Sequence, residues 1–224
     1  VDYFTTESLK SDPKGKQYVG MLKTISNNPA DIIPTADIIL FCLPAFLVEQ
    51  TLETIKPYLS SKTIVGSVVG NTGFFIFAHK VLADQPIGLF AFQRVPYISR
   101  VVEYGKKASL LGYKDKLLIA TEHISNPQEF CNDISMLFCT PTILLQSFYE
   151  VTLSNSNPIL HTGRLYSMWK DWNGEHYKNN SLFYTSWTDE ASDLLIKMDE
   201  EFFCLLDKLG VSTEHLPTLL QHYE

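Results

Sequence analysis

The stretch Asp37-Ile-Ile-Leu-Phe-Cys-Leu43 is a continuous apolar run that ends at Pro44, and it decides the fold class of the first part of the chain. Runs of this length are typical of central strands in a parallel sheet, because helices cover both faces of such a sheet. A helix is predicted from Leu47 to about Ile55, and Pro57 ends it because proline disfavours a helical residue before it. The stretch therefore predicts a strand followed by a helix.

The same alternation continues along the chain. A second strand is predicted over Thr63–Val69, followed by the turn Gly70–Gly73 and a helix through Val81, and a third strand over Ile87–Phe92. Strand and helix in alternation indicate a doubly wound α/β sheet. Ligands of such sheets lie outside the carboxyl ends of the strands. The candidate ligand positions at these ends are Leu43-Pro44-Ala45, Gly70-Asn71-Thr72 and Gln93-Arg94.

The remaining sequence divides into a strand-rich and a helical part. Further strands are predicted at Lys107–Leu111, Lys116–Thr121 and Thr140–Gln146, with a helix from Asn126 to Phe138. Everything after about Phe148 has a helical pattern. Its longest helix begins at the N-cap candidate Thr188 and stops before Gly210. We therefore predict an α/β part over residues 1–147 and an all-α part over residues 148–224.

Composition excludes several classes of protein. The 224 residues are 45% hydrophobic and carry a formal charge of −7, which argues against nucleic acid or an anionic membrane as the main partner. No apolar run is long enough for a membrane span, and the N-terminus lacks the features of a signal peptide. The four cysteines form no Cys-x-x-Cys pair and lie in apolar contexts. They predict reduced core thiols in a cytoplasmic protein, with no metal site.

A dinucleotide-binding fold usually carries Gly-x-Gly-x-x-Gly after its first strand, and this sequence has no such motif. The segment Gly66-Ser-Val-Val-Gly-Asn-Thr-Gly73 has neither the spacing nor the position. Two explanations remain open at this point. Either the domain binds no dinucleotide, or the first half of that domain is missing from this chain.

The segment Asn155-Ser-Asn-Pro-Ile-Leu-His161 places a histidine in a helical, aromatic-rich region. Either a helix starts at Asn157, with asparagine as cap and Pro158 in the first turn, or a helix from Glu150 is kinked at Pro158. In both cases Asn157, His161 and Arg164 share one helix face. Histidine titrates near neutrality and suits proton transfer, although a lone histidine is more often a packing residue.

Several motifs together resemble the octopine/nopaline (opine) dehydrogenases. Asn157-Pro-Ile-Leu-His161 and the following Arg-Leu-Tyr and Trp-Lys-Asp-Trp resemble the start of that family's helical domain, while Ala36–Phe46, Gly66–Phe74 and Phe92–Tyr97 resemble strand regions of its cofactor domain. The resemblance implies a Rossmann-type dinucleotide-binding domain whose N-terminal part is missing here. It also implies an all-α helical substrate domain whose C-terminal part is truncated.

The resemblance further implies the residues that act. His161 would be the catalytic acid/base, and Gln93, Asn157 and Arg94 would contact the substrate. NAD or NADP would lie against Leu43, Pro44, Ala45, Gly70, Asn71 and Thr72. The reaction would join an amino acid to a 2-oxo acid, so the partners are small molecules, and a homodimer is allowed.

Other interpretations of the same residues stay open. Gln93 also fits a polar cap on a strand, Arg94 and Arg100 fit surface charges, and turn formation explains Asn71. The aromatic side chains Tyr166, Trp169 and Trp172 are either core or the lining of an amino-acid pocket. For the whole protein, the alternatives are a 2-oxo-acid or ketopantoate-type reductase and a non-catalytic binding or assembly module.

Overall fold

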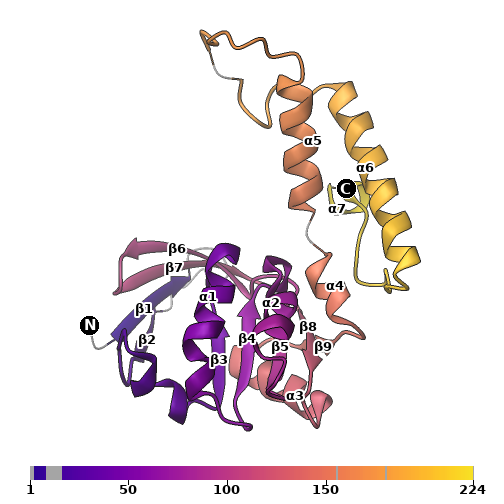
Figure 1. The fold of residues 1–224 in the computed structure, drawn as a ribbon. Helices are drawn as coiled ribbons and strands as arrows, with labels where there is room; N and C mark the ends of the chain where they lie inside the picture. Colours follow the sequence, from indigo (N-terminus) through magenta and orange to yellow (C-terminus); the bar gives the residue numbers. More distant parts are fainter. Residues whose placement is uncertain (1–2, 9–16, 155, 180, 224) are drawn as a thin grey trace. The chain divides into compact units, whose positions relative to one another are not determined.

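A computed structural model describes residues 3–8, 17–154, 156–179 and 181–223 (Figure 1). The chain forms two compact units, Val1–Thr152 and Leu153–Glu224. Helix α4 (Phe148–Thr152) falls in the first unit, although its sequence pattern grouped it with the helical part. The reason is packing, because Val151 and Phe148 belong to the hydrophobic core of the α/β unit.

The first unit is built on a five-stranded sheet with the strand order β3-β4-β5-β8-β9. Strands β3, β4 and β5 run parallel, whereas β8 runs antiparallel to β5 and parallel to β9. The bounds of these strands are β3 (Ile38–Phe41), β4 (Ile64–Val68), β5 (Gly88–Phe92), β8 (Leu117–Glu122) and β9 (Thr142–Leu144). Each strand lies within the segment predicted for it or within one residue of it.

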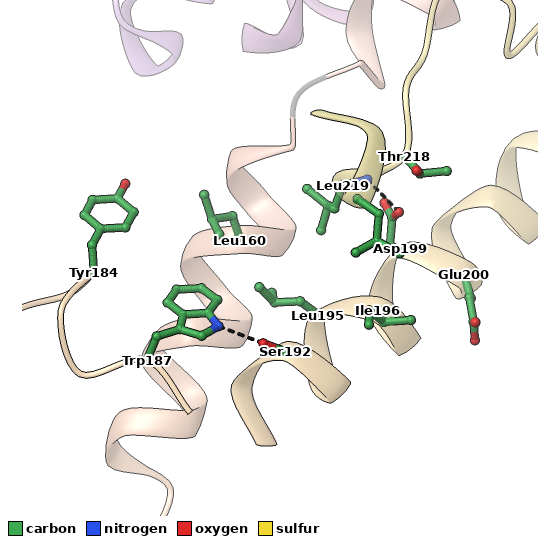
Figure 2. A pocket seen from close by; sticks show the side chains of 11 residues that line it. Leu160, Tyr184, Trp187, Ser192, Leu195, Ile196, Asp199, Glu200, Thr218 and Leu219 are labelled. Carbon is green, nitrogen blue, oxygen red and sulfur yellow. Dashed lines mark hydrogen bonds between the residues drawn. The ribbon is translucent and has the colours of Figure 1, made fainter. Parts of the chain in front are cut away.

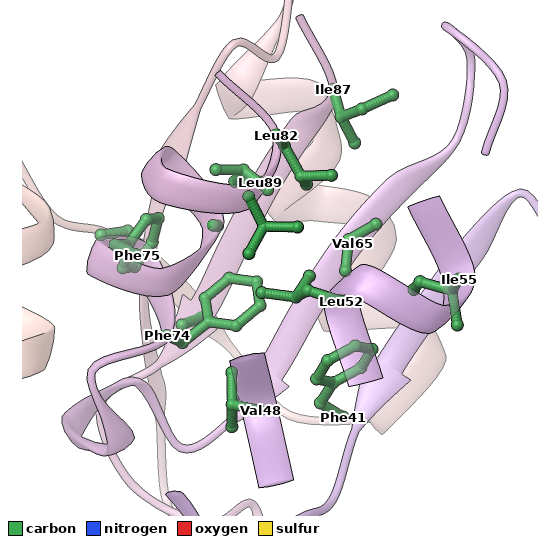
Figure 3. Packing of buried hydrophobic residues seen from close by; sticks show 14 of the residues in the cluster. Phe41, Val48, Leu52, Ile55, Val65, Phe74, Phe75, Leu82, Ile87 and Leu89 are labelled. Atoms are coloured by element: carbon green, nitrogen blue, oxygen red, sulfur yellow. The ribbon is translucent and has the colours of Figure 1, made fainter. Parts of the chain in front are cut away.

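Helices cover both faces of this sheet, as the doubly wound pattern predicts. Side chains alternate along β5: Leu89 and Ala91 pack on one face with α1 (Ala45–Ile55) and α2 (Phe74–Val81). Figure 3 shows this layer, in which Val48 and Leu52 of α1 meet Phe74 of α2. On the other face, Phe90 and Phe92 pack against α3 (Pro127–Phe138). Alternating burial on both faces fixes the register of β5, because a shift by one residue would exchange the two layers.

A second sheet of four strands has the order β2-β1-β7-β6, and the sequence did not predict it as a separate sheet. Its strands are β1 (Tyr3–Ser8), β2 (Gln17–Met21), β6 (Tyr97–Glu103) and β7 (Lys107–Tyr113). The strand predicted at Lys107–Leu111 exists, but it pairs with β1 and β6 rather than with the larger sheet. The α/β unit therefore contains more strands than the alternating sequence pattern predicts.

The second unit is helical. It contains α5 (Asn157–Trp169), α6 (Asp189–Lys208) and α7 (Leu219–Tyr223). The hydroxyl of Thr188 accepts a hydrogen bond from the Ala191 backbone, which confirms the predicted N-cap of α6. Gly210 has φ of +64°, a conformation that favours glycine, and it follows the end of α6 as predicted.

Close packing joins α5 to α6 at Gly163. A Cβ atom built on Gly163 would lie 2.8 Å from Cδ2 of Leu195 and 3.0 Å from Sδ of Met198. A side chain at this position would force the ends of the Leu195 and Met198 side chains to move. Leu160, Leu195 and Leu219 continue the contact as a small hydrophobic core of α5, α6 and α7.

The structure bears on two expectations from composition, the burial of the cysteines and the lack of a membrane span. All four cysteines are unpaired, but only Cys131 is buried, whereas Cys42, Cys139 and Cys204 are exposed. The prediction of four core thiols is therefore wrong for three of them, because an apolar neighbourhood in sequence does not place a side chain inside. In the described part of the chain, no helix has the length and apolar character that a membrane span requires.

Candidate functional site

The turns after β3, β4 and β5 meet at one edge of the sheet. The three strands are parallel neighbours in register, with Phe41 opposite Ser67 and Val68 opposite Phe92. The carboxyl ends of all three strands therefore lie at the same edge of the sheet. This brings together the three groups of residues predicted at the strand ends, at the edge where α/β sheets bind their ligands.

The two turns predicted for cofactor contact are built differently. After β3, Pro44 lies just before the first turn of α1, and Pro44 and Ala45 are exposed while Leu43 is half-buried. After β4, residues Gly70–Thr72 form a short 3₁₀ turn in which Asn71 is half-buried. The backbone of Thr72 belongs to this turn, and its side chain lies outside the described part of the structure. Both turns thus lie at the edge of the sheet where β3 and β4 end.

Gly70 has a packing reason to be glycine. A Cβ atom there would lie 2.3 Å from Cγ1 of Val151 and 3.0 Å from Cβ of Ala91. The hydroxyl of Thr152 also donates a hydrogen bond to the Gly70 carbonyl. Helix α4 therefore rests directly on this turn. A glycine that looked like a turn residue in the sequence allows the close approach of a helix from another part of the chain.

Gln93 is buried at the end of β5, with 6% of its surface exposed. Its backbone N–H donates to the Leu118 carbonyl, and its side-chain Nε2 donates to the Glu150 carbonyl at 3.1 Å. The carboxylate of Glu150 is buried too, and it accepts hydrogen bonds from the backbone N–H groups of Gln146 and Ser147. The amide of Gln93 is thus held in one orientation, which suits both a structural link and a binding group.

Arg94 and Arg100 lie in different surroundings. Arg94 is half-buried, and burial lowers the pKa of its guanidinium. Arg100 lies on β6, where its side chain is exposed and donates to the carbonyl of Ser99. Only Arg94 lines a pocket with Gln93. The surface-charge interpretation therefore fits Arg100 but not Arg94.

His161 lies on α5, which begins at Asn157 and has Pro158 in its first turn. The alternative of a kinked helix running from Glu150 is wrong, because α4 ends at Thr152. The cap position is taken by Ser156 rather than Asn157, and Ser156 makes no side-chain capping bond. Asn157 is an exposed residue in the first turn of the helix.

The imidazole of His161 is exposed and stacks at an angle of 57° on Phe183, with 5.3 Å between ring centroids. Arg164, one turn further on, is 2% exposed and donates to the carbonyls of Phe183 and Ser186. Its guanidinium also lies 5.0 Å from the ring of Trp187. Arg164 therefore fixes the segment that contacts His161, while the histidine itself stays accessible to solvent and reactants.

Comparison with known proteins shows which families the chain resembles. Residues 144–224 match the family described as NAD/NADP octopine/nopaline dehydrogenase, alpha-helical domain. The chain is 27% identical over 187 residues to opine dehydrogenase from Haliotis discus hannai, which covers 80% of this chain and 46% of that protein. It is 26% identical over 198 residues to tauropine dehydrogenase from Arabella iricolor. That match covers 84% of this chain and 49% of the tauropine dehydrogenase.

The fold agrees with these sequence matches. A solved structure of octopine dehydrogenase with NADH and L-arginine superposes with a TM-score of 0.83 at 20% identity, covering 99% of this chain and 57% of that one. Together the sequence matches and the fold support the opine dehydrogenase family for this chain. The chain spans about half the length of the curated opine dehydrogenases that it matches.

The largest pocket described on the helical unit of this opine dehydrogenase relative has a volume of 600 Å³ (Figure 2). Its apolar wall comes from Leu160 on α5, Leu195 and Ile196 on α6, and Trp187. Its polar groups include Asp199, whose carboxylate accepts the Leu219 backbone N–H. Because the wall is mainly hydrocarbon, this pocket suits an apolar group better than the charged reactants of an opine dehydrogenase.

Tyr166 and Trp169 of α5, and Trp172 just after this helix, are not part of the core. Tyr166, Trp169 and Trp172 are 61%, 45% and 57% exposed, so the core interpretation is wrong. Trp169 lines a small pocket of 190 Å³ beside Arg164, and Trp172 donates its indole N–H to the Glu175 carbonyl. Helical spacing marks a shared face, but it does not say what covers that face.

Sequence reasoning missed two groups around Gln93. Glu150 was missed although Ser147-Phe-Tyr-Glu150 has the Ser-x-x-Glu spacing of a capping box, in which the glutamate accepts the Ser147 backbone N–H. Lys114 and Lys116 line the same pocket as Gln93 and Arg94. They reach it because β8 runs antiparallel to β5, so the start of β8 lies beside the end of β5. A prediction of that strand direction would have been needed to find them.

Proposed function

We propose that this chain is part of an NAD(P)H-dependent opine dehydrogenase, which condenses the amino group of an amino acid with a 2-oxo acid and reduces the product. The amine and the ketone first form an imine and release water. Addition of a hydride and a proton to the C=N bond then gives a secondary amine. One reduced nicotinamide is oxidised for each product formed.

The observation that carries the proposal is the position of His161. It ends the Asn-Pro-Ile-Leu-His segment at the start of α5, within the residues that match the family's helical domain. Its ring is exposed and held against Phe183 rather than buried. An accessible imidazole on a rigid helix suits proton transfer near neutral pH.

In this reaction His161 donates a proton toward the carbonyl oxygen of the oxo acid and takes one from the attacking amine. Gln93 orients the oxo acid with its fixed amide. Arg94 supplies a positive charge to a carboxylate, which a guanidinium binds through two parallel hydrogen bonds. Asn157, exposed in the first turn of α5, contacts the substrate beside the histidine.

The residues at the sheet edge fit one part of a dinucleotide. The turns Leu43-Pro44-Ala45 and Gly70-Asn71-Thr72 follow neighbouring parallel strands, so both would contact the same ligand. Asn71 would hold the ribose next to the nicotinamide. When bound, NADH or NADPH supplies the hydride for the reduction. The sequence contains no glycine-rich phosphate loop, so the pyrophosphate has no assigned residues here.

The test uses the full-length gene product with NADH or NADPH, a panel of amino acids and a 2-oxo acid. Cofactor oxidation that requires both substrates, with the secondary amine found by mass spectrometry, is the expected result. His161→Gln should lower turnover by about 100-fold, the usual scale for losing general acid/base catalysis. His176→Gln, which changes another exposed histidine of the helical unit, is the matched control.

Folding and cofactor affinity of His161→Gln should equal those of the wild type, as measured by circular dichroism and by quenching of protein fluorescence. A His161→Gln protein that turns over like the wild type would remove the histidine from the mechanism. Cofactor oxidation with an oxo acid alone, giving a hydroxy acid, would instead indicate a 2-oxo-acid reductase.

A further inference from the structure

The helical unit holds a second pocket, of 190 Å³, beside Arg164. Three parts of the unit line it: the second half of α5, the connecting segment 170–187 and the start of α6. Hydroxyl groups enter the lining from Ser167, Ser181, Ser186 and Thr188. This pocket therefore suits a polar ligand, unlike the larger apolar pocket of the same unit.

Arg164 is the buried cation of this pocket, since only 2% of its surface is exposed. Its guanidinium donates to the carbonyls of Phe183 and Ser186 and to the hydroxyl of Ser167, at 2.9, 2.7 and 3.4 Å. The ring of Trp187, 5.0 Å away, offsets part of the charge. All of these partners are neutral, and no carboxylate of a described residue forms an ion pair with Arg164. Buried charges are normally paired, because taking an ion out of water without a counter-ion is costly.

The carboxylate in the pocket lining does not serve as that counter-ion. Glu190 lines the pocket, but its carboxylate pairs with the ammonium of Lys170. Two cations, Arg164 and Lys170, thus stand against this one carboxylate, which leaves an excess of one positive charge. The local charge therefore favours a monovalent anion.

The donors and the volume narrow the ligand further. A guanidinium has five N–H groups, and described residues accept three hydrogen bonds from Arg164. Two N–H groups remain, which is the number that an oxyanion takes from a guanidinium through parallel bonds. The volume lies below the range of whole small-molecule sites, about 300–1,000 Å³, so the occupant is a small group.

We propose that this pocket binds one small oxyanion, either a carboxylate or an inorganic oxyanion, with Arg164 as its main partner. The anion supplies the missing counter-charge of Arg164, which in turn holds the carbonyls of Phe183 and Ser186. Anion binding thus orders the segment 170–187, including the Phe183 ring that contacts His161. The site is separate from the proposed reaction, and its test measures binding rather than turnover.

The experiment measures binding of acetate and of inorganic phosphate to the full-length protein by calorimetry, in a chloride-free zwitterionic buffer. The wild type should bind at least one of them, and the one that binds tells a carboxylate from an inorganic oxyanion. Arg164→Gln should raise the Kd about tenfold or more, because it removes charge-assisted hydrogen bonds. Cleavage of the segment 170–187 by a protease should slow when the anion is added to the wild type.

Glu190→Gln gives a change of the opposite sign. It removes the carboxylate from the lining and frees Lys170, so the Kd should fall about two- to fivefold. Glu201→Gln, the same substitution at an exposed position further along α6, is the matched control and should leave the Kd unchanged.

The proposal is overturned if neither anion binds, or if Arg164→Gln binds as tightly as the wild type, since the anion would then lie elsewhere. If Arg164→Gln does not fold, Glu190→Gln decides, and a Kd equal to that of Glu201→Gln would overturn the proposal. Cleavage of the segment 170–187 that is equally fast with and without the anion would contradict the ordering role.

Discussion

The side-chain amide of Gln93 donates a hydrogen bond of 3.1 Å to the backbone oxygen of Glu150, and this bond joins the end of β5 to α4. The two residues are 57 positions apart in the sequence. The buried carboxylate of Glu150 shapes the turn before α4 by accepting two backbone N–H groups. The orientation of Gln93 thus depends on a residue that contacts no reactant in the proposed mechanism.

Substitution of Glu150 tests this support. Glu150→Ala leaves the N–H groups of Gln146 and Ser147 without their acceptor, and the free energy of unfolding should fall by about 3 kcal/mol. Glu150→Gln keeps an oxygen acceptor and should lose clearly less. Urea unfolding followed by circular dichroism gives both values, with the exposed Glu53→Ala as control. Equal stability of Glu150→Ala and the wild type would contradict a structural role for the carboxylate.

Gly70→Ala should destabilise the α/β unit by overpacking. The new methyl group would lie 2.3 Å from Cγ1 of Val151, so either the Val151 side chain or α4 must move. A loss of about 2 kcal/mol is expected in urea unfolding. Val151→Ala removes the obstructing atoms, so the double variant should lose less than the sum of the two single variants. Strict additivity would show that the two residues do not meet.

Arg164→Met should loosen the segment between α5 and α6. It removes the hydrogen bonds to the carbonyls of Phe183 and Ser186, and a loss of about 3 kcal/mol is expected for bonds from a charged group. Arg164→Lys should be nearly as damaging, because one ammonium cannot reproduce the planar fork. Limited proteolysis should cut the 170–187 segment faster in both variants. The matched control is Arg100→Met. Unchanged cleavage in Arg164→Met would contradict the role of Arg164 in holding the segment between α5 and α6.

The pair Asp84–Lys56 predicts a pH effect on stability. Its 2.6 Å hydrogen bond from Lys56 lowers the pKa of Asp84 below the usual value. A carboxyl group with a lowered pKa stabilises the fold above its unfolded pKa of about 3.9, and this contribution is lost as pH falls through the folded value. The Tm difference between wild type and Asp84→Asn should therefore be constant near neutral pH and disappear in acid. A difference that persists in acid, or one equally large for the exposed Asp133→Asn, would contradict this assignment.

The elements that sequence predicted best are those whose signals are local. The apolar runs around Ile38–Phe41 and Gly88–Phe92 are strands because each buries side chains on both faces, and the cap at Thr188 lies within a few residues of its partner. Strand pairing is not local. β7 and β8 are separated by three residues, Lys114–Lys116, yet they belong to different sheets, and nothing in that short turn indicates it.

The candidate site likewise has parts that the sequence predicts and parts that depend on contacts between distant residues. The turns at Leu43–Ala45 and Gly70–Thr72 could be predicted because the carboxyl ends of parallel strands share an edge. The sequence could not show that Gly70 serves the packing of α4, because Val151 lies far away along the chain. It also could not separate Arg94 from Arg100, since half-burial beside Gln93 depends on the tertiary fold.

The reversed direction of β8 has a consequence for how this family can diversify. Three segments of the ligand edge leave a strand and enter a helix or a turn packed against the core, so their residues are constrained by packing. The segment Lys114–Lys116 instead arrives at the edge, between two strands of different sheets, with Asp115 and Lys116 exposed. Its side chains can be exchanged with little disturbance of the hydrophobic layers. Substitutions in this segment can thus change the charge beside Gln93 while the fold of the α/β unit is retained.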